Sequence, residues 1–110
     1  MEINTWEDPI RIDEFDTGGK RRVLGYTDEM MLVHYSLNQG EEGSPHSHED
    51  TVQASFVIEG CLELLGEYSA TITAGDSYLI PPGTVHGVRA TEPCKVLDVF
   101  SPPLDKYKST

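Results

Sequence analysis

Three of the four histidines in this 110-residue sequence have a spacing suited to binding a metal ion. His46 and His48 are separated by one residue, so a β-strand would place both imidazoles on one face, because side chains alternate between the two faces of a strand. Gln53 begins the next predicted strand and can bring an amide oxygen to the same point. His86 follows a turn-rich segment and adds a third imidazole. Three imidazole nitrogens and one amide oxygen form a suitable ligand set for one divalent ion.

The remaining histidine, His34, lies in an apolar run and shares a face with Leu32 and Ser36. If this face is interior, His34 is a fourth imidazole near the ion or a hydrogen-bonding partner of one of the ligands. The alternative is a core histidine bonded to a backbone carbonyl. The sequence leaves both interpretations open.

Asp98 is a candidate acid or base in the last predicted strand. Val96 and Phe100 share its face, and Leu97 and Val99 occupy the other face. Apolar residues on both sides indicate a strand that is covered on both faces, where a carboxylate is costly to bury unless it is paired or functional. The alternative is a structural carboxylate that caps loop amides.

The segments that position these side chains have the pattern of β-strands. From residue 20 onward, short runs rich in Val, Ile, Leu, Thr and Tyr alternate with Gly, Pro, Asn and Asp, and no segment has a long period of 3.6 residues. The regular spacing of the runs predicts an all-β chain that forms a small sandwich or barrel. The predicted strands cover residues 22–27, 31–37, 52–59, 61–65, 68–73, 77–80, 87–90 and 95–100.

The length of the chain and its hydrophobic content of 37% fit a single domain. We expect an irregular N-terminal arm over residues 1–19, a barrel over residues 20–104 and a C-terminal tail over residues 105–110. The basic cluster Lys20-Arg21-Arg22 is expected to be a solvated strand end rather than a ligand-binding patch.

The charge of the chain argues against two classes of partner. Eight basic residues against 19 acidic ones give a formal net charge of −11, which repels nucleic acids and anionic lipid head groups. No apolar stretch approaches the ~20 residues of a transmembrane helix, and the first residues lack the basic and apolar regions of a secretory signal. Two cysteines without C-x-x-C spacing are too few for a disulfide framework. We therefore expect a cytoplasmic protein that binds neither nucleic acid nor membrane.

The two histidine segments together resemble the two motifs of the cupin superfamily. The resemblance implies a single-domain cupin, a conical antiparallel β-barrel of the double-stranded β-helix or jelly-roll type, with metal ligands inside the barrel mouth. Two positions depart from the usual pattern: Gln53 stands where a glutamate ligand is common, and Ala90 where an asparagine often follows. The residues that match the motifs in register are Gly40, His46, His48 and Gly60 in the first, and Gly75, Pro81, Gly83 and His86 in the second.

Residues 97–102, Leu-Asp-Val-Phe-Ser-Pro, resemble the C-terminal end of the pectin-degradation cupins that linearise unsaturated uronates. That family also uses two histidines, a glutamine and a third histidine, and this end supplies an aspartate, a phenylalanine and, four residues later, an arginine. Asp98 and Phe100 match, so the resemblance implies that Asp98 moves a proton and Phe100 shapes the pocket. Leu104 stands at the arginine position, so a carboxylate-bearing sugar loses its obvious bidentate partner.

The neutral side chain of Gln53 affects the charge of the expected metal site. With only neutral ligands a divalent ion keeps its full charge of +2, whereas a carboxylate ligand would leave +1, so the ion polarises a substrate oxygen more strongly. Zinc, iron, nickel and manganese are all compatible with these ligands. The alternative is that Gln53 marks a cupin without a metal.

The resemblance implies a metal-dependent isomerase or a lyase-like enzyme that acts on a small, oxygen-rich, sugar- or keto-acid-like substrate. Three other functions stay open: cyclisation of an aromatic polyketide chain, oxygen-dependent cleavage with iron, and binding of a ligand or metal without turnover. Cupin domains of this size commonly pair through their sheets, and outward apolar residues such as Leu97 and Val99 need cover. We therefore expect a homodimer.

Overall fold

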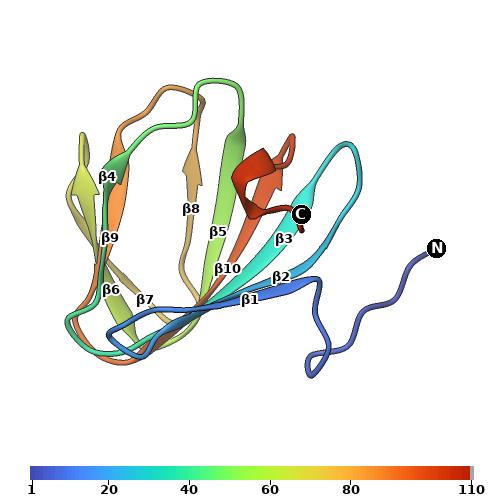
Figure 1. The fold of residues 1–110 in the computed structure, drawn as a ribbon. Helices are drawn as coiled ribbons and strands as arrows, with labels where there is room; N and C mark the ends of the chain where they lie inside the picture. The colour runs from blue at the N-terminus through green and yellow to red at the C-terminus, as the bar shows by residue number, and fades with distance from the viewer. Residues whose placement is uncertain (110) are drawn as a thin grey trace.

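The computed structural model describes residues 1–109 of the chain, and residue 110, the end of the expected C-terminal tail, lies outside the described residues. Within this range the chain forms ten strands and one short 3₁₀ helix, η1 (Figure 1). No helical segment in the described range has the length and apolar character needed to cross a membrane. The elements are β1 Arg11–Glu14, β2 Lys20–Tyr26, β3 Met31–Leu37, β4 Glu42–His46, β5 Val52–Glu59, β6 Cys61–Gly66, β7 Ala70–Thr73, β8 Ser77–Ile80, β9 His86–Ala90, β10 Cys94–Ser101 and η1 Asp105–Tyr107.

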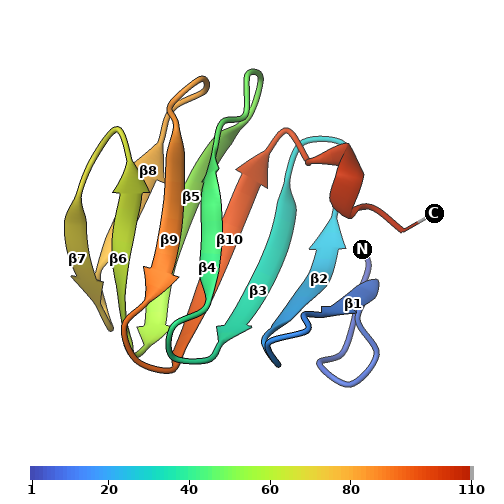
Figure 2. The same cartoon turned by 60° about the vertical axis from the view of Figure 1, so that its left-hand side comes forward.

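The strands form two antiparallel sheets that face each other. One sheet has six strands in the order β1-β2-β3-β10-β5-β8, and the other has four in the order β4-β9-β6-β7. Figures 1 and 2 show the two sheets diverging toward the end of the molecule where η1 and the β4–β5 and β8–β9 loops lie. This arrangement confirms the predicted all-β antiparallel barrel.

The interior follows from alternation along the strands. In β10, Cys94, Val96, Asp98 and Phe100 are buried, whereas the residues between them are less buried or exposed. Two apolar clusters fill the space between the sheets, one around Leu62 and Val96 and the other around Phe100. Asp98 is therefore the single polar side chain in an otherwise apolar row of β10.

The structure corrects the sequence prediction at two strands. The expected irregular arm over residues 1–19 contains β1, which pairs with β2 at the edge of the larger sheet. β1 was missed because three of its four residues are charged, which is untypical of a strand. β4 was missed because Gly43 and Pro45 are poor strand formers, and its pairing with β9 is interrupted between Gly43 and His46.

Candidate metal centre

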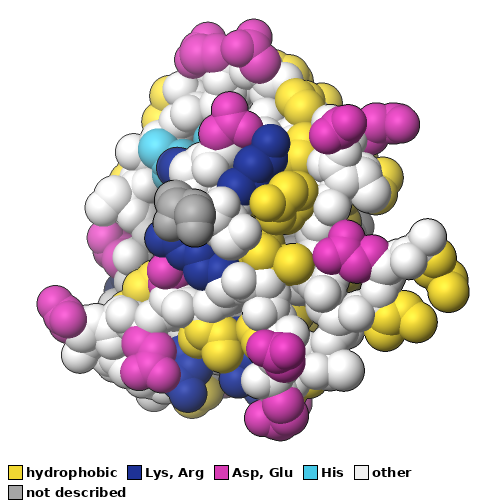
Figure 3. Space-filling model, turned by 45° about the vertical axis from the view of Figure 1, so that its right-hand side comes forward, with side chains coloured by type: hydrophobic (Ala, Val, Ile, Leu, Met, Phe, Trp, Pro, Cys, Tyr) yellow, Lys and Arg dark blue, Asp and Glu magenta, His cyan; other side chains and the backbone are white. Residues whose placement is uncertain are grey.

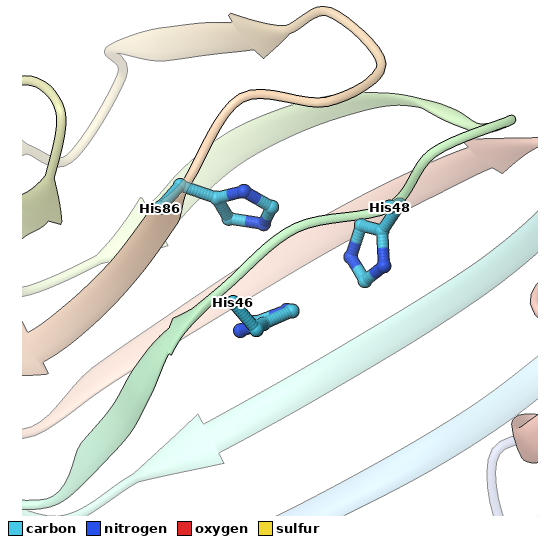
Figure 4. Close-up of side chains that lie close together, drawn as sticks. All are labelled: His46, His48 and His86. Carbon is cyan, nitrogen blue, oxygen red and sulfur yellow. The ribbon is translucent and has the colours of Figure 1, made fainter.

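The ends of two paired strands bring the first two histidines together. His46 is the last residue of β4 and lies directly opposite His86, the first residue of β9. Gly87 permits the close approach of these strands, because a Cβ atom there would lie 2.5 Å from the carbonyl oxygen of Gly43. His48 follows two residues after β4 and completes the cluster (Figure 4).

The three imidazole rings converge on one point. One ring nitrogen from each of His46, His48 and His86 lies within 4.8 Å of the others. The ring centroids are separated by 4.5 to 5.1 Å. Figure 4 shows the rings turned toward a common centre from β4, the following loop and β9. The geometry thus brings together three of the four predicted ligands.

Two backbone carbonyls orient the rings. The Nδ1 atom of His46 lies 2.8 Å from the carbonyl oxygen of Ser44, and that of His86 lies 2.9 Å from the carbonyl oxygen of Thr84. An imidazole that donates from Nδ1 to a carbonyl leaves Nε2 with a free lone pair, and this pattern is typical of metal-ligating histidines. These two rings are therefore held in the tautomer that binds a metal through Nε2.

Burial favours the neutral form of the His48 and His86 rings. Burial, and the proximity of His46 and His86, lower the pKa of His48 to about 4. Burial also lowers the pKa of His86, although the carbonyl of Thr84 opposes that effect. Neutral imidazole is the form that binds a metal, so His48 and His86 are ready to bind without losing a proton at neutral pH.

Gln53 turns its amide oxygen toward the histidines. Its Oε1 atom lies 3.1 Å from Nε2 of His86, and its Nε2 atom donates to Oγ of Ser55 at 3.0 Å. When His86 donates from Nδ1 to Thr84, its Nε2 and the Oε1 of Gln53 are two acceptors that face each other. Two ligand atoms bound at right angles, each about 2.1 Å from an ion, lie about 3 Å apart. The residues present therefore fit a divalent metal ion.

Asp98 lies in the same cavity, beyond Gln53. Its carboxyl group accepts a hydrogen bond of 2.6 Å from Oγ of Ser55 at Oδ1 and a longer one of 3.4 Å from Nε2 of Gln53 at Oδ2. Burial raises the pKa of Asp98 to about 7, although the bond from Ser55 opposes the shift. A carboxyl group with this pKa can both accept and release a proton near neutral pH.

A cavity of about 310 Å³ joins these groups. The three clustered histidines, Gln53, Asp98 and Phe100 all line it. The Phe100 ring packs edge-on against His48, with 5.8 Å between the ring centroids, and it is 2% exposed. Phe100 thus forms an apolar wall next to the polar groups.

His34 is not part of the cluster, which corrects its proposed role as a fourth ligand. Met31, Val33 and Tyr35 point into the barrel, so alternation places His34 on the opposite face of β3. There it is buried under Trp6, with the two rings edge-on and their centroids 4.7 Å apart. Among the described residues no hydrogen-bond partner is found for its Nδ1 atom.

The sequence reasoning missed the basic residue of the cavity. Arg21, expected at a solvated strand end, lines the cavity together with Tyr35 and Tyr107. Arg21 shares a face with Val23, which is fully buried, but Arg22 shares the other face with the apolar Leu24, so alternation along β2 alone does not show which arginine faces inward. Arg22 points to the other face and stacks over Trp6.

The chain matches known proteins over most of its length. Residues 33–100 match the model of the Cupin domain family. A pectin degradation protein, KdgF of Dickeya dadantii, is 33% identical over 98 residues, which cover 87% of this chain and 89% of that protein.

Two solved structures are also similar. The structure of KdgF from Halomonas sp. has a TM-score of 0.85 at 28% identity and covers 96% of this chain and 98% of that one. An RmlC-like cupin from Shewanella frigidimarina has a TM-score of 0.87 at 30% identity and covers 97% and 96%. These matches confirm the resemblance predicted from the two histidine motifs and from the segment around Asp98 and Phe100. By its sequence, its double-sheet barrel and its relatives, the chain belongs to the cupin domain family.

Proposed function

We propose that this protein is a metal-dependent isomerase or lyase-like enzyme that acts on a small, oxygen-rich, sugar- or keto-acid-like substrate. The relationship to KdgF, a pectin degradation protein, supports this class of substrate. One observation carries the proposal. The carboxyl group of Asp98, isolated from bulk water, opens into the cavity that the three histidines also line.

His46, His48, Gln53 and His86 would hold one divalent ion, and zinc, iron, nickel and manganese are the candidates. A bound ion of this kind supplies a Lewis acid that polarises a substrate hydroxyl or carbonyl oxygen. With only imidazole and amide ligands, the site would keep the full +2 charge of the ion. The substrate oxygen therefore binds at the histidine end of the cavity.

Asp98 moves the proton. Its Oδ1 atom is occupied by the short bond from Ser55, and the longer contact to Gln53 leaves Oδ2 as the atom that exchanges the proton. Oδ2 accepts a proton from one position of the substrate and returns it to another, which is the requirement of an isomerisation. Phe100 keeps water from this part of the cavity and fixes the ring of His48 at its edge.

The test uses an unsaturated uronate as substrate and compares the wild-type protein with Asp98→Asn. Loss of the substrate is followed by ultraviolet absorbance of its conjugated double bond, and the product is identified by NMR. We expect turnover by the metal-loaded wild-type protein and a fall of about 100-fold or more in the variant with its metal content unchanged. Full turnover by Asp98→Asn would overturn the role of this carboxyl group.

We also propose that two copies pair through the outer face of the larger sheet. The register places Leu32, Val99, Ala54 and Leu79 in one row across β3, β10, β5 and β8, and Leu79 is 74% exposed. A contiguous apolar row of this kind is typical of an interface. Light scattering of the purified protein tests the dimer.

The two free cysteines support a location in the reducing cytoplasm.

A further inference from the structure

Arg21 is a partly buried cation in the wall of the cavity. Its side chain is 18% exposed, and its guanidinium carbon lies 4.2 Å from the centroid of the Tyr107 ring. Tyr107 belongs to η1, which lies at the open end of the barrel (Figure 2). The net charge of −11 is already far from zero, which favours solubility, so a cation that faces a cavity needs another explanation.

The ion pair that holds Arg21 leaves the local cluster positive. Nε and Nη2 of Arg21 both donate to Oδ2 of Asp13, at 3.1 and 3.0 Å, and Oδ1 of Asp13 accepts a bond from Arg11 at 2.9 Å. The bonds from the two guanidinium groups lower the pKa of Asp13 despite its burial. One carboxylate is thus shared by two guanidinium groups, and the three residues carry a net charge of +1.

The Nη1 atom of Arg21 remains free to bind a ligand. The hydrogen bonds found within residues 1–109 use Nε and Nη2 of this side chain and none uses Nη1. Nη1 carries two N–H donors, and a guanidinium group binds a carboxylate more strongly and more directionally than a neutral donor does.

Arg21 and the reactive groups lie on one wall of the cavity. In the sheet register Arg21 is opposite Tyr35, and Tyr35 is opposite Val96, the inward residue next to Asp98. Burial and the neighbouring Tyr107 phenol raise the pKa of Tyr35, Asp98 raises it further, and Arg21 opposes the shift, so the Tyr35 phenol lies near both charged groups. On the face shown in Figure 3, histidine and Lys or Arg side chains lie beside one another.

Acidic residues line the cavity as well. Asp98 is the buried carboxyl group described above, and Glu42 is exposed. Glu41 also lines the cavity, but its carboxylate accepts hydrogen bonds from the backbone N–H of Asn38 and from the hydroxyl of Thr17. That carboxylate is therefore already satisfied by protein donors. An anionic ligand is therefore attracted to the Arg21 side of the cavity.

We infer that Arg21 is the specificity-determining residue that recognises a carboxylate of the substrate, which makes the substrate a carboxylated sugar or a similar keto acid. This inference rests on the proposed function, whose substrate class it narrows. Arg21 reaches the cavity from β2, and its Nη1 supplies a cationic donor that Leu104 cannot provide from the C-terminal end. The substrate then spans the cavity, with its carboxylate at Arg21 and an oxygen at the histidine end.

The experiment compares the binding of glucuronate and glucose, which differ by the carboxylate, to the zinc-loaded protein by NMR titration. The ratio of the two affinities is measured within each variant, so it does not depend on the fraction of folded protein. We expect Arg21→Gln to lower the preference for glucuronate by about 10- to 100-fold. Lys20→Gln, which removes one exposed positive charge from the outer face of the same strand, should leave the ratio unchanged.

The double variant Asp13→Asn/Arg21→Gln provides a second test, because it removes Arg21 without leaving the carboxylate of Asp13 short of a partner. Arg11 loses its bond to that carboxylate but keeps its hydrogen bonds to the carbonyl oxygens of Lys106 and Lys108. A ratio equal to that of the wild type in both Arg21 variants would overturn the inference. Turnover of an unsaturated uronate by the wild-type protein is measured separately. If the ratio depends on Arg21 but no turnover is seen, the proposed reaction is overturned and the carboxylate site stands. If turnover is seen but the ratio does not depend on Arg21, the carboxylate site is overturned and the proposed reaction stands.

Discussion

Replacing Asp98 by Asn tests whether this carboxyl group takes up a proton when the protein folds. The substitution keeps the shape of the side chain, and the amide oxygen can still accept the hydrogen bond from Ser55 that measures 2.6 Å to the carboxyl group. It removes the titratable proton. Any difference that depends on pH between the two proteins therefore reports on the carboxyl group itself.

The size and sign of the effect follow from the burial of Asp98, which raises its pKa from 3.8 to about 7. Below about pH 4 the group is protonated in both the folded and the unfolded chain, so it does not affect stability. Between about pH 4 and pH 7 the unfolded chain loses the proton and the folded chain keeps it, so the wild-type protein becomes less stable as the pH rises. Above pH 7 the loss is complete and on the order of 4 kcal/mol.

Urea unfolding of protein stripped of metal with a chelator measures this difference at pH 4.5, 6 and 8. We expect the free energy of unfolding of Asp98→Asn, relative to the wild type, to increase steadily over this range. The amide N–H of the variant faces Nε2 of Gln53, and this contact adds an offset of about 1 kcal/mol that does not depend on pH. Asp28→Asn, a change at an exposed carboxylate, is the control and should show no such trend.

A difference that stays constant from pH 4.5 to pH 8 would refute the reasoning. It would mean that Asp98 ionises in the folded protein as easily as in the unfolded chain, and its proposed role as a proton carrier near neutral pH would lose its physical basis. Turnover provides the second measurement. If the free energy of unfolding of Asp98→Asn relative to the wild type rises with pH and its turnover rate is about 100-fold lower, the same buried carboxyl group accounts for both results.

Five further outcomes test the metal site and the interface. His46→Ala and His86→Ala should each abolish the binding of one divalent ion per chain, measured by elemental analysis, and chelation should lower the melting temperature of the wild type because binding energy adds to folding stability. Gln53→Glu should bind metal at least as tightly in competition with a chelator but turn over more slowly, because the site charge falls from +2 to +1. His34→Ala should keep full metal content, and a loss of metal would contradict its outward position. Phe56 lies on the outer face of β5 and is 45% exposed, so Phe56→Glu should convert the proposed dimer to a monomer in light scattering.

The sequence predicted that His46 and His48 lie together because their spacing is local, whereas His86 was joined to them through the resemblance to the second cupin motif. One residue between His46 and His48 places both on one side of an extended segment, and the turn before His86 ends at the start of a strand. The orientation of each ring was not predictable, because it depends on the carbonyl oxygens of Ser44 and Thr84, whose directions are set by the irregular pairing of β4 with β9. A pattern of residue types contains no information on such a backbone irregularity.

The direction of the basic residues in β2 was ambiguous for a different reason. Lys20, Arg21 and Arg22 have the same charge, so no hydrophobic contrast shows which of them faces the interior. The register with β3 resolves it, because Arg21 pairs with the inward Tyr35 and Arg22 with the outward His34. Alternation then gives two neighbouring arginines opposite surroundings: Arg22 covers Trp6 outside the barrel, and Arg21 enters the cavity with Asp13 as its partner. The strand β1 that supplies Asp13 was not predicted, so the counter-ion that stabilises the partly buried Arg21 was not predicted either.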